Sequence, residues 1–210
     1  MTKIGVLGLQ GSFAEHIAAI EKCGAQAVDI RHSWQLADLD GLIIPGGEST
    51  AIAKLTGDNP DPIFDTIKKR VEAGLPVYGT CMGSIFLAQE IEGSEQGRLA
   101  CMDIKVRRNA FGPQRNSFET SINIDALGAK PFPAVFIRAP IVVSVGADVE
   151  VLASVDEGIV MARQKHLLVT AFHPEITNDL RVHQYFLSMV TDSKQSQADR
   201  VVAKPDCIPA

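Results

Sequence analysis

The residues best suited to chemistry lie at positions 79–83, where Cys81 is framed by Gly79 and Gly83. An apolar run precedes them and a helix-like run follows, which is the setting of a nucleophile elbow, a tight strand-to-helix turn. Glycines permit the close packing of such a turn. A thiol needs a base or a helix N-terminus to become an effective nucleophile. We therefore interpret Cys81 as an acyl-transfer nucleophile, and Cys23 and Cys101, which lack this frame, as buried structural cysteines.

A candidate base lies far downstream. His173 ends an apolar strand pattern, and Glu175 follows two positions later. Residues i and i+2 of an extended chain point to the same face, so Glu175 is expected to orient the imidazole while His173 faces Cys81. Without Cys81, a surface turn with two polar residues is the better interpretation. The remaining histidines are interpreted as structural: His16, His32, His166 and His183.

A third motif is the pair Gly46 and Gly47, which follows an apolar strand pattern and precedes polar residues that open a helix. Backbone N–H groups exposed at such a turn can bind an oxyanion. An ordinary strand-to-helix turn with Ser49 as N-cap is the alternative. No phosphate-loop motif is present, and the glycine spacing at 5–11 is not that of a dinucleotide site.

Composition narrows the function classes. The 210 residues carry a net charge of −5, which argues against a nucleic-acid or anionic-membrane surface. The four cysteines form no C-x-x-C pair, so we expect no metal site, and no cofactor is predicted. The chain opens directly on a strand pattern, without a signal peptide or membrane span, and we expect a reducing cytoplasm.

The elements that must position these residues divide into two halves. In the first half, strands are expected at 4–9, 25–30, 41–44 and 75–80, alternating with helices at 13–22, 62–73 and 82–91. Ser12 and Glu15 fit a capping box at the first helix. The alternation predicts an α/β fold, a three-layer, mostly parallel sheet with helices on both faces.

In the second half, consecutive strands predict an antiparallel extension at one side of the sheet. They are expected at 103–106, 118–124, 135–138, 149–155, 159–163 and 167–172. A closing helix at 178–190 has Asn178 as its N-cap. We therefore expect a single domain at 1–190 and a polar, poorly ordered tail at 191–210.

The motifs together resemble the class I glutamine amidotransferases, a Cys-His-Glu family with a flavodoxin-like sheet. Within that family they resemble the glutaminase subunits of two-component pyridoxal 5′-phosphate synthases. The resemblance covers about residues 3–190. It rests on the segments at 5–11, 45–50, 79–81, 108–112, 117–119, 136–140 and 172–175.

The resemblance implies glutamine hydrolysis to glutamate and ammonia, with Cys81, His173 and Glu175 as the triad. It also implies a barrel-shaped synthase partner that takes the ammonia. The positions that bind glutamine in the family are Gly47, Glu48, Ser49, Arg108, Ile137 and Arg138. The implied oxyanion hole consists of the backbone N–H groups of Gly47 and Met82.

Two positions depart from the family pattern. Met82 stands where alanine is usual, and Pro113 stands where arginine is common. The larger Met82 side chain is expected to narrow the pocket or touch the partner. Two other functions stay open: the glutaminase subunit of a different class I amidotransferase, and a Cys-His peptidase on the same fold.

Overall fold

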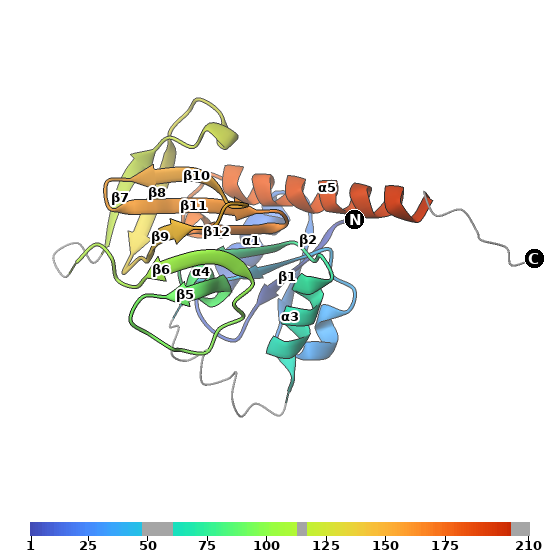
Figure 1. Cartoon of the computed structure of the whole chain (residues 1–210). Helices are drawn as coiled ribbons and strands as arrows, with labels where there is room; N and C mark the ends of the chain where they lie inside the picture. Colours follow the sequence, from blue (N-terminus) through green and yellow to red (C-terminus); the bar gives the residue numbers. More distant parts are fainter. Residues whose placement is uncertain (48–60, 113–116, 203–210) are drawn as a thin grey trace, which may run out of the picture.

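The computed structural model describes residues 1–47, 61–112 and 117–202 (Figure 1). Its first half is a parallel sheet in the order β2-β1-β3-β4. The strands are β1 (Lys3–Leu7), β2 (Gln26–Ile30), β3 (Gly41–Ile44) and β4 (Val77–Thr80). The helices of this half are α1 (Phe13–Lys22), α3 (Ile63–Glu72) and α4 (Met82–Leu87), with a short 3₁₀ helix, η1 (Ser33–Leu36).

The second half extends the same sheet. β12 pairs parallel with β4, and beyond it the order continues β11-β9-β6-β5, with β10 paired to β11. The strands are β5 (Ala88–Ile91), β6 (Met102–Arg107), β9 (Ile141–Val145), β10 (Glu150–Val155), β11 (Gly158–Gln164) and β12 (Leu167–Thr170). β7 (Ser117–Ile122) and β8 (Phe132–Ile137) form a separate antiparallel pair. The remaining elements are η2 (Asp125–Leu127), η3 (Pro174–Ile176) and α5 (Arg181–Val202).

Side chains alternate across the sheet and build one core on each face. Leu42 and Ile44 of β3 pack with α3 and α4, whereas Ile43 between them packs with α1 and α5 on the other face. The β7–β8 pair contributes to this second core through Phe132 and Phe136. The prediction of a three-layer, flavodoxin-like α/β fold with an antiparallel extension is confirmed. None of the helices in the described ranges is both long and apolar enough to cross a membrane.

Several local expectations were wrong. The helix predicted at 82–91 ends at Leu87, because residues 88–91 pair with β6 as strand β5. β9 was not predicted, although its apolar sequence is typical of a buried strand. Tertiary pairing, which local propensity does not contain, decides the β5 case, whereas β9 was overlooked despite its local pattern.

The closing helix also differs from its prediction. α5 begins at Arg181 instead of 178, and Asp179 in place of Asn178 accepts the Arg181 backbone N–H at 3.1 Å. The helix continues to Val202, because its polar second half contains neither glycine nor proline to stop it. Residues 191–202 are therefore helical, and 203–210 lie outside the described residues. The domain boundary at 190 stays a prediction.

Candidate active site

Three adjacent parallel strands end around Cys81. It follows β4 directly, and β4 lies between β3 and β12, with Ile44 beside Gly79 and Thr170 beside Thr80. The loop after β3 carries Gly46 and Gly47, and the chain after β12 leads to η3. Clefts of open α/β sheets form at such carboxyl ends of the strands. The three separate sequence motifs therefore meet at one edge of the sheet.

The backbone at Cys81 has the strained geometry of an elbow. Its φ and ψ are 47° and −106°, a combination that a non-glycine residue rarely adopts. Its N–H donates to the Thr170 carbonyl at 2.8 Å, which ties the turn to β12. A Cβ on Gly83 would lie 2.1 Å from the Ile44 carbonyl oxygen, and one on Gly79 would lie 2.6 Å from the Gly83 backbone. Both glycines are thus required by close packing, as the sequence pattern indicated.

His173 and Glu175 are paired. His173 Nδ1 lies 2.7 Å from Glu175 Oε1, and both side chains are buried. The His173 backbone N–H donates to the Val135 carbonyl of β8 at 2.8 Å, which fixes the position of the residue. The pairing does not arise from an extended segment as expected, because the 3₁₀ helix η3 begins at Pro174. The turn brings the carboxylate to Nδ1 and leaves Nε2 of the ring available.

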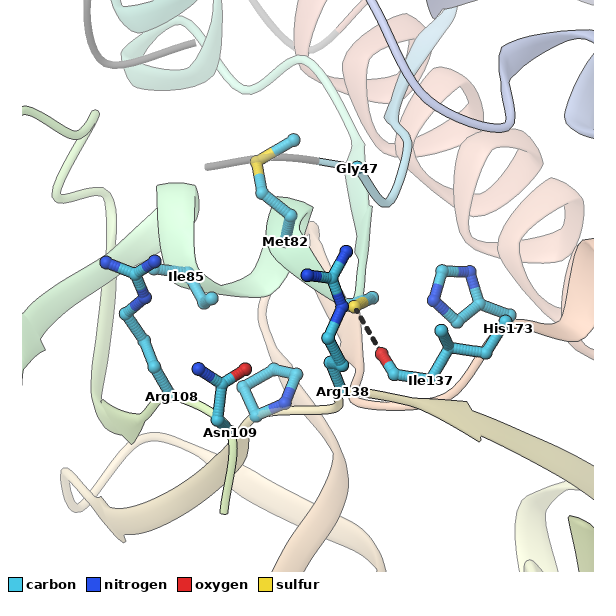
Figure 2. Close-up of a pocket in the computed structure, with 10 residues that line it drawn as sticks. Gly47, Met82, Ile85, Arg108, Asn109, Ile137, Arg138 and His173 are labelled. Carbon is cyan, nitrogen blue, oxygen red and sulfur yellow. Dashed lines mark hydrogen bonds between the residues drawn. The ribbon is translucent and has the colours of Figure 1, made fainter. Parts of the chain in front are cut away.

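The imidazole also reaches the nucleophile. Cys81 is close enough to His173 to raise the pKa of its imidazole. A Cβ on Gly46 would lie 2.4 Å from His173 Cε1 and 3.2 Å from Cys81 Cβ, so both side chains border the same glycine. The Cys81 Sγ further lies 3.9 Å from the Ile137 carbonyl oxygen, the contact dashed in Figure 2. The structure therefore brings Cys81, His173 and Glu175 into one cluster.

The charges in this cluster support each other. Burial lowers the pKa of His173, but hydrogen bonds to Cys81 and Glu175 and the negative charge of both outweigh it and raise that pKa to about 10. Burial raises the pKa of Glu175, but the opposing effects of His16, His173 and the Ser12 hydrogen bond are larger and lower that pKa to about 2. The arrangement favours an imidazolium next to an ionised Glu175. Such a cation beside Cys81 is the partner that stabilises a thiolate.

A cavity of about 220 Å³ opens beside this cluster (Figure 2). Arg108 and Arg138 both line it, so its charge suits a small anion-bearing substrate. Arg108 Nη1 donates to Gln96 Oε1 at 3.1 Å. Within the described ranges, by contrast, no hydrogen bond or ion pair engages the guanidinium of Arg138. The complete lining is Gly47, Cys81, Met82, Ile85, Arg108, Asn109, Ile137, Arg138, Pro140 and His173.

The predicted glutamine-binding positions are only partly visible. Gly47, Arg108, Ile137 and Arg138 line the cavity, whereas Glu48 and Ser49 lie outside the described residues, as does Pro113. Met82 begins α4, so its backbone N–H has no partner within the helix. Its side chain is 1% exposed and belongs to the core, which leaves little of it for contact with a partner protein.

Sequence reasoning missed several contributors. Ser12 makes no helix-capping hydrogen bond, so the predicted capping box is wrong; its Oγ donates to Glu175 Oε1 at 2.5 Å instead. His16 and His183, interpreted as structural, lie in the same buried cluster. A sequence signal existed, since Ser12 and His16 are one helical turn apart and therefore share a face. Asn109 and Pro140 of the cavity lie in the segments 108–112 and 136–140 that carry the resemblance, but neither was singled out as a site residue.

Known proteins show the same combination of fold and motifs. Residues 6–192 match the model of the SNO glutamine amidotransferase family. The chain belongs to this family. Membership confirms the prediction of an amidotransferase glutaminase, an enzyme that hydrolyses glutamine.

Curated relatives are similar to this chain over nearly their whole length. One is the pyridoxal 5'-phosphate synthase subunit PdxT of Carboxydothermus hydrogenoformans, 53% identical over 90% of this chain and 97% of the relative. The PdxT of Anoxybacillus flavithermus is 51% identical over 93% of this chain and all of the relative.

Solved structures agree with this assignment. A crystal structure described as a glutamine amidotransferase superposes with a TM-score of 0.83 at 46% identity, covering 90% of this chain and 98% of that one. A putative GMP synthase component of Thermoplasma acidophilum has a TM-score of 0.71 at 18% identity, covering 94% of this chain and 98% of that one, and shares the fold alone.

Proposed function

We propose that Cys81, His173 and Glu175 form the catalytic triad of glutamine hydrolysis, and that the ammonia feeds a partner synthase in the formation of pyridoxal 5′-phosphate. The 2.7 Å contact between His173 and Glu175, beside Cys81 at the cavity, carries the catalytic part. The names of the PdxT relatives support the role in the formation of pyridoxal 5′-phosphate.

The reaction follows from these positions. The Cys81 thiolate attacks the side-chain amide carbon of glutamine, and backbone N–H groups of Gly47 and Met82 stabilise the oxyanion. His173 donates its proton to the amide nitrogen and the C–N bond breaks. Ammonia departs, and the acyl group remains on Cys81 as a thioester. His173 then takes a proton from water, whose oxygen attacks the thioester. Glutamate departs and the thiolate returns with an imidazolium beside it.

The cavity supports a free amino acid as substrate. Its volume of about 220 Å³ is below the range of roughly 300–1,000 Å³ that is typical of pockets for drug-sized ligands. Arg138, or Arg108 with it, would bind the α-carboxylate, and Glu48 is the candidate for the ammonium group. A Cys-His peptidase would need an extended groove for the chain on both sides of the scissile bond, so the small cavity favours the glutaminase.

The identity of the partner protein is indicated by the names of the relatives and not by the geometry of the site. A chain called a synthase subunit works with at least one other subunit, and the resemblance implies that this one is a barrel-shaped synthase. A different amidotransferase partner would use the same triad. Co-purification from the native organism distinguishes them, because a synthase that condenses a pentose and a triose phosphate is expected in the complex.

The decisive experiment is Cys81→Ala, assayed for glutamate release with the synthase present. We expect loss of glutamine hydrolysis while the complex still forms. Cys101→Ala is the matched control, since Cys101 is a half-buried thiol outside the cavity lining and should leave turnover unchanged. An electrophilic glutamine analogue should alkylate Cys81 in the parent chain. Retained hydrolysis in Cys81→Ala would exclude the assignment.

A further inference from the structure

A second set of polar side chains is buried against Glu175. His16 from α1, His183 from α5 and Thr80 from β4 are each 0% exposed. His16 Nδ1 lies 3.0 Å from His183 Nε2, and His16 Nε2 lies 3.1 Å from Thr80 Oγ1 and 3.4 Å from Glu175 Oε2. Three elements of the fold therefore converge on one imidazole that makes no contact with the cavity.

Two buried atoms decide where the protons of this cluster lie. Within the described ranges, Glu175 Oε2 and His183 Nδ1 have no hydrogen-bond partner. If His16 carried its proton on Nδ1, its Nε2 lone pair would face the carboxylate, and His183 would be left with a buried Nδ1–H that has no acceptor. A proton on His16 Nε2 instead faces Thr80 Oγ1 at 3.1 Å and lies beside the Glu175 carboxylate, whose Oε2 is 3.4 Å from Nε2. His183 then donates from Nε2 to His16 Nδ1. This second arrangement removes the contact between a nitrogen lone pair and the carboxylate, and it leaves no buried N–H of His183 without an acceptor.

The same Nε2–H reaches toward the oxyanion side of the site. Thr80 Oγ1 accepts the backbone N–H of Gly46 at 2.9 Å, and Gly46 precedes Gly47, whose N–H is proposed to bind the oxyanion. His16 thus lies between the carboxylate that orients the base and the hydroxyl that holds the glycine turn.

We propose that His16 is a positioning residue, whose Nε2–H holds Glu175 and Thr80 together and whose tautomer is fixed by His183. The inference rests on the proposed triad. It assigns a role in glutamine hydrolysis to a histidine pair that touches neither substrate nor nucleophile. Its effect is to keep the orientation of His173 and the placement of the Gly46–Gly47 turn coupled.

The cluster works in its neutral form. Burial lowers the pKa of His16, with His173 acting in the same direction and Glu175 and Glu15 opposing. Burial, and the proximity of His16, lower the pKa of His183 to about 3, with Glu175 opposing. Both shifts favour the neutral imidazole, the form in which His16 can donate from Nε2 while it accepts at Nδ1.

The test compares His16→Met, which removes the donor at similar size, with His16→Gln, whose amide N–H can replace it. Both are assayed as the full complex with the synthase. In His16→Met we expect kcat to fall roughly tenfold to a hundredfold, with KM within about twofold, because a small displacement of a catalytic group has this effect. The acidic limb of the kcat/KM profile should move to higher pH, because Glu175 loses a neighbour that favours its ionised form. His16→Gln should recover most of both.

His166→Met is the control, since His166 is a partly buried histidine that is bonded to the Val71 carbonyl at 3.0 Å and lies at the opposite end of β12 from the site. It should leave kcat and the acidic limb unchanged. The proposal would be overturned if folded His16→Met had the kcat and the acidic limb of the parent chain. It would also be overturned if folded His16→Gln were as impaired as His16→Met. If His16→Met does not fold, Thr80→Val against Thr80→Ser tests the link to Gly46: equal kcat in those two variants would overturn it as well. Failure of the triad itself would show separately, as hydrolysis by Cys81→Ala.

Discussion

Ser12 and Glu175 are joined by a 2.5 Å hydrogen bond between Oγ and Oε1, although 163 positions separate them in the chain. The oxygen that accepts this bond also accepts His173 Nδ1. Ser12 stands at the N-cap position of α1 but makes no side-chain cap, so its hydroxyl serves the carboxylate and not the helix. The start of the first helix is thereby connected to the candidate base near the end of the chain.

Ser12→Ala should destabilise the fold and slow glutamine hydrolysis. A hydrogen bond to a charged group contributes about 1.5–3 kcal/mol, and no capping bond is lost in addition. We expect the free energy of unfolding at pH 7 to fall by about that amount and kcat to fall severalfold. Urea denaturation and steady-state assays measure the two effects. Ser188→Ala is the control, because the exposed Ser188 hydroxyl donates to the nearby Tyr185 carbonyl. Equal stability of the two variants would contradict the prediction.

Gly46→Ala should impair catalysis by direct contact. The new methyl group would lie 2.4 Å from His173 Cε1, so the imidazole must move away from Cys81. Displacement of a catalytic group by about 1 Å can cost roughly a hundredfold in rate. We expect a loss of this order in kcat, read from glutamate release. In Gly146→Ala the nearest atoms to the methyl group would be those of the Asp103 carboxylate, which can rotate away, and turnover should persist.

Glu175→Gln should change how stability depends on acid. The folded pKa of Glu175, about 2, is below its ordinary value of 4.5, so its contribution is complete above pH 4.5 and is lost as pH falls toward 2. The variant lacks this contribution. We expect it to be less stable at pH 7 and to lose less stability between pH 4.5 and 2, as followed by denaturation midpoints in a buffer series. Glu92→Gln, which removes an exposed carboxylate paired with Arg107, should leave the slope nearly unchanged. Parallel curves for Glu175→Gln and the parent chain would refute the prediction.

Arg138→Met and Arg108→Met should weaken substrate binding more than chemistry. A charge-assisted hydrogen bond to the substrate carboxylate contributes about 1.5–3 kcal/mol, or roughly tenfold to a hundredfold in KM. The larger effect is expected for Arg138, since Arg108 already donates to Gln96. Steady-state kinetics with glutamine separates KM from kcat. Arg98→Met, outside the cavity lining, is the control. An unchanged KM in both variants would assign the carboxylate to another group.

Much of the site could be predicted from sequence because its parts are local motifs. The glycines around Cys81 and the His173–Glu175 spacing each reflect one turn, and the strand pattern places all of them at the same sheet edge. The strand β5 was not predictable in this way, because it depends on pairing with β6. The extension of α5 could have been read from the absence of glycine and proline, but its polar composition was interpreted as a tail. Ser12 and His16 share a helix face, but that spacing does not identify their partner. Their local pattern fits an ordinary helix start, and only the return of the chain at Glu175 gives them a different partner.

The position of β4 between β3 and β12 affects the protein during its synthesis. Val77 pairs with Leu167, so about 90 residues must be added after β4, the strand that leads to the candidate nucleophile, before its second neighbour exists. At about 5–20 residues per second this is a delay of roughly 5 to 18 s on the ribosome. Throughout that interval the nascent chain holds the Cys81 thiol without the Thr170 carbonyl that ties its turn and without the His173–Glu175 pair beside it. The cluster therefore cannot assemble before residues 167–175 have been synthesised.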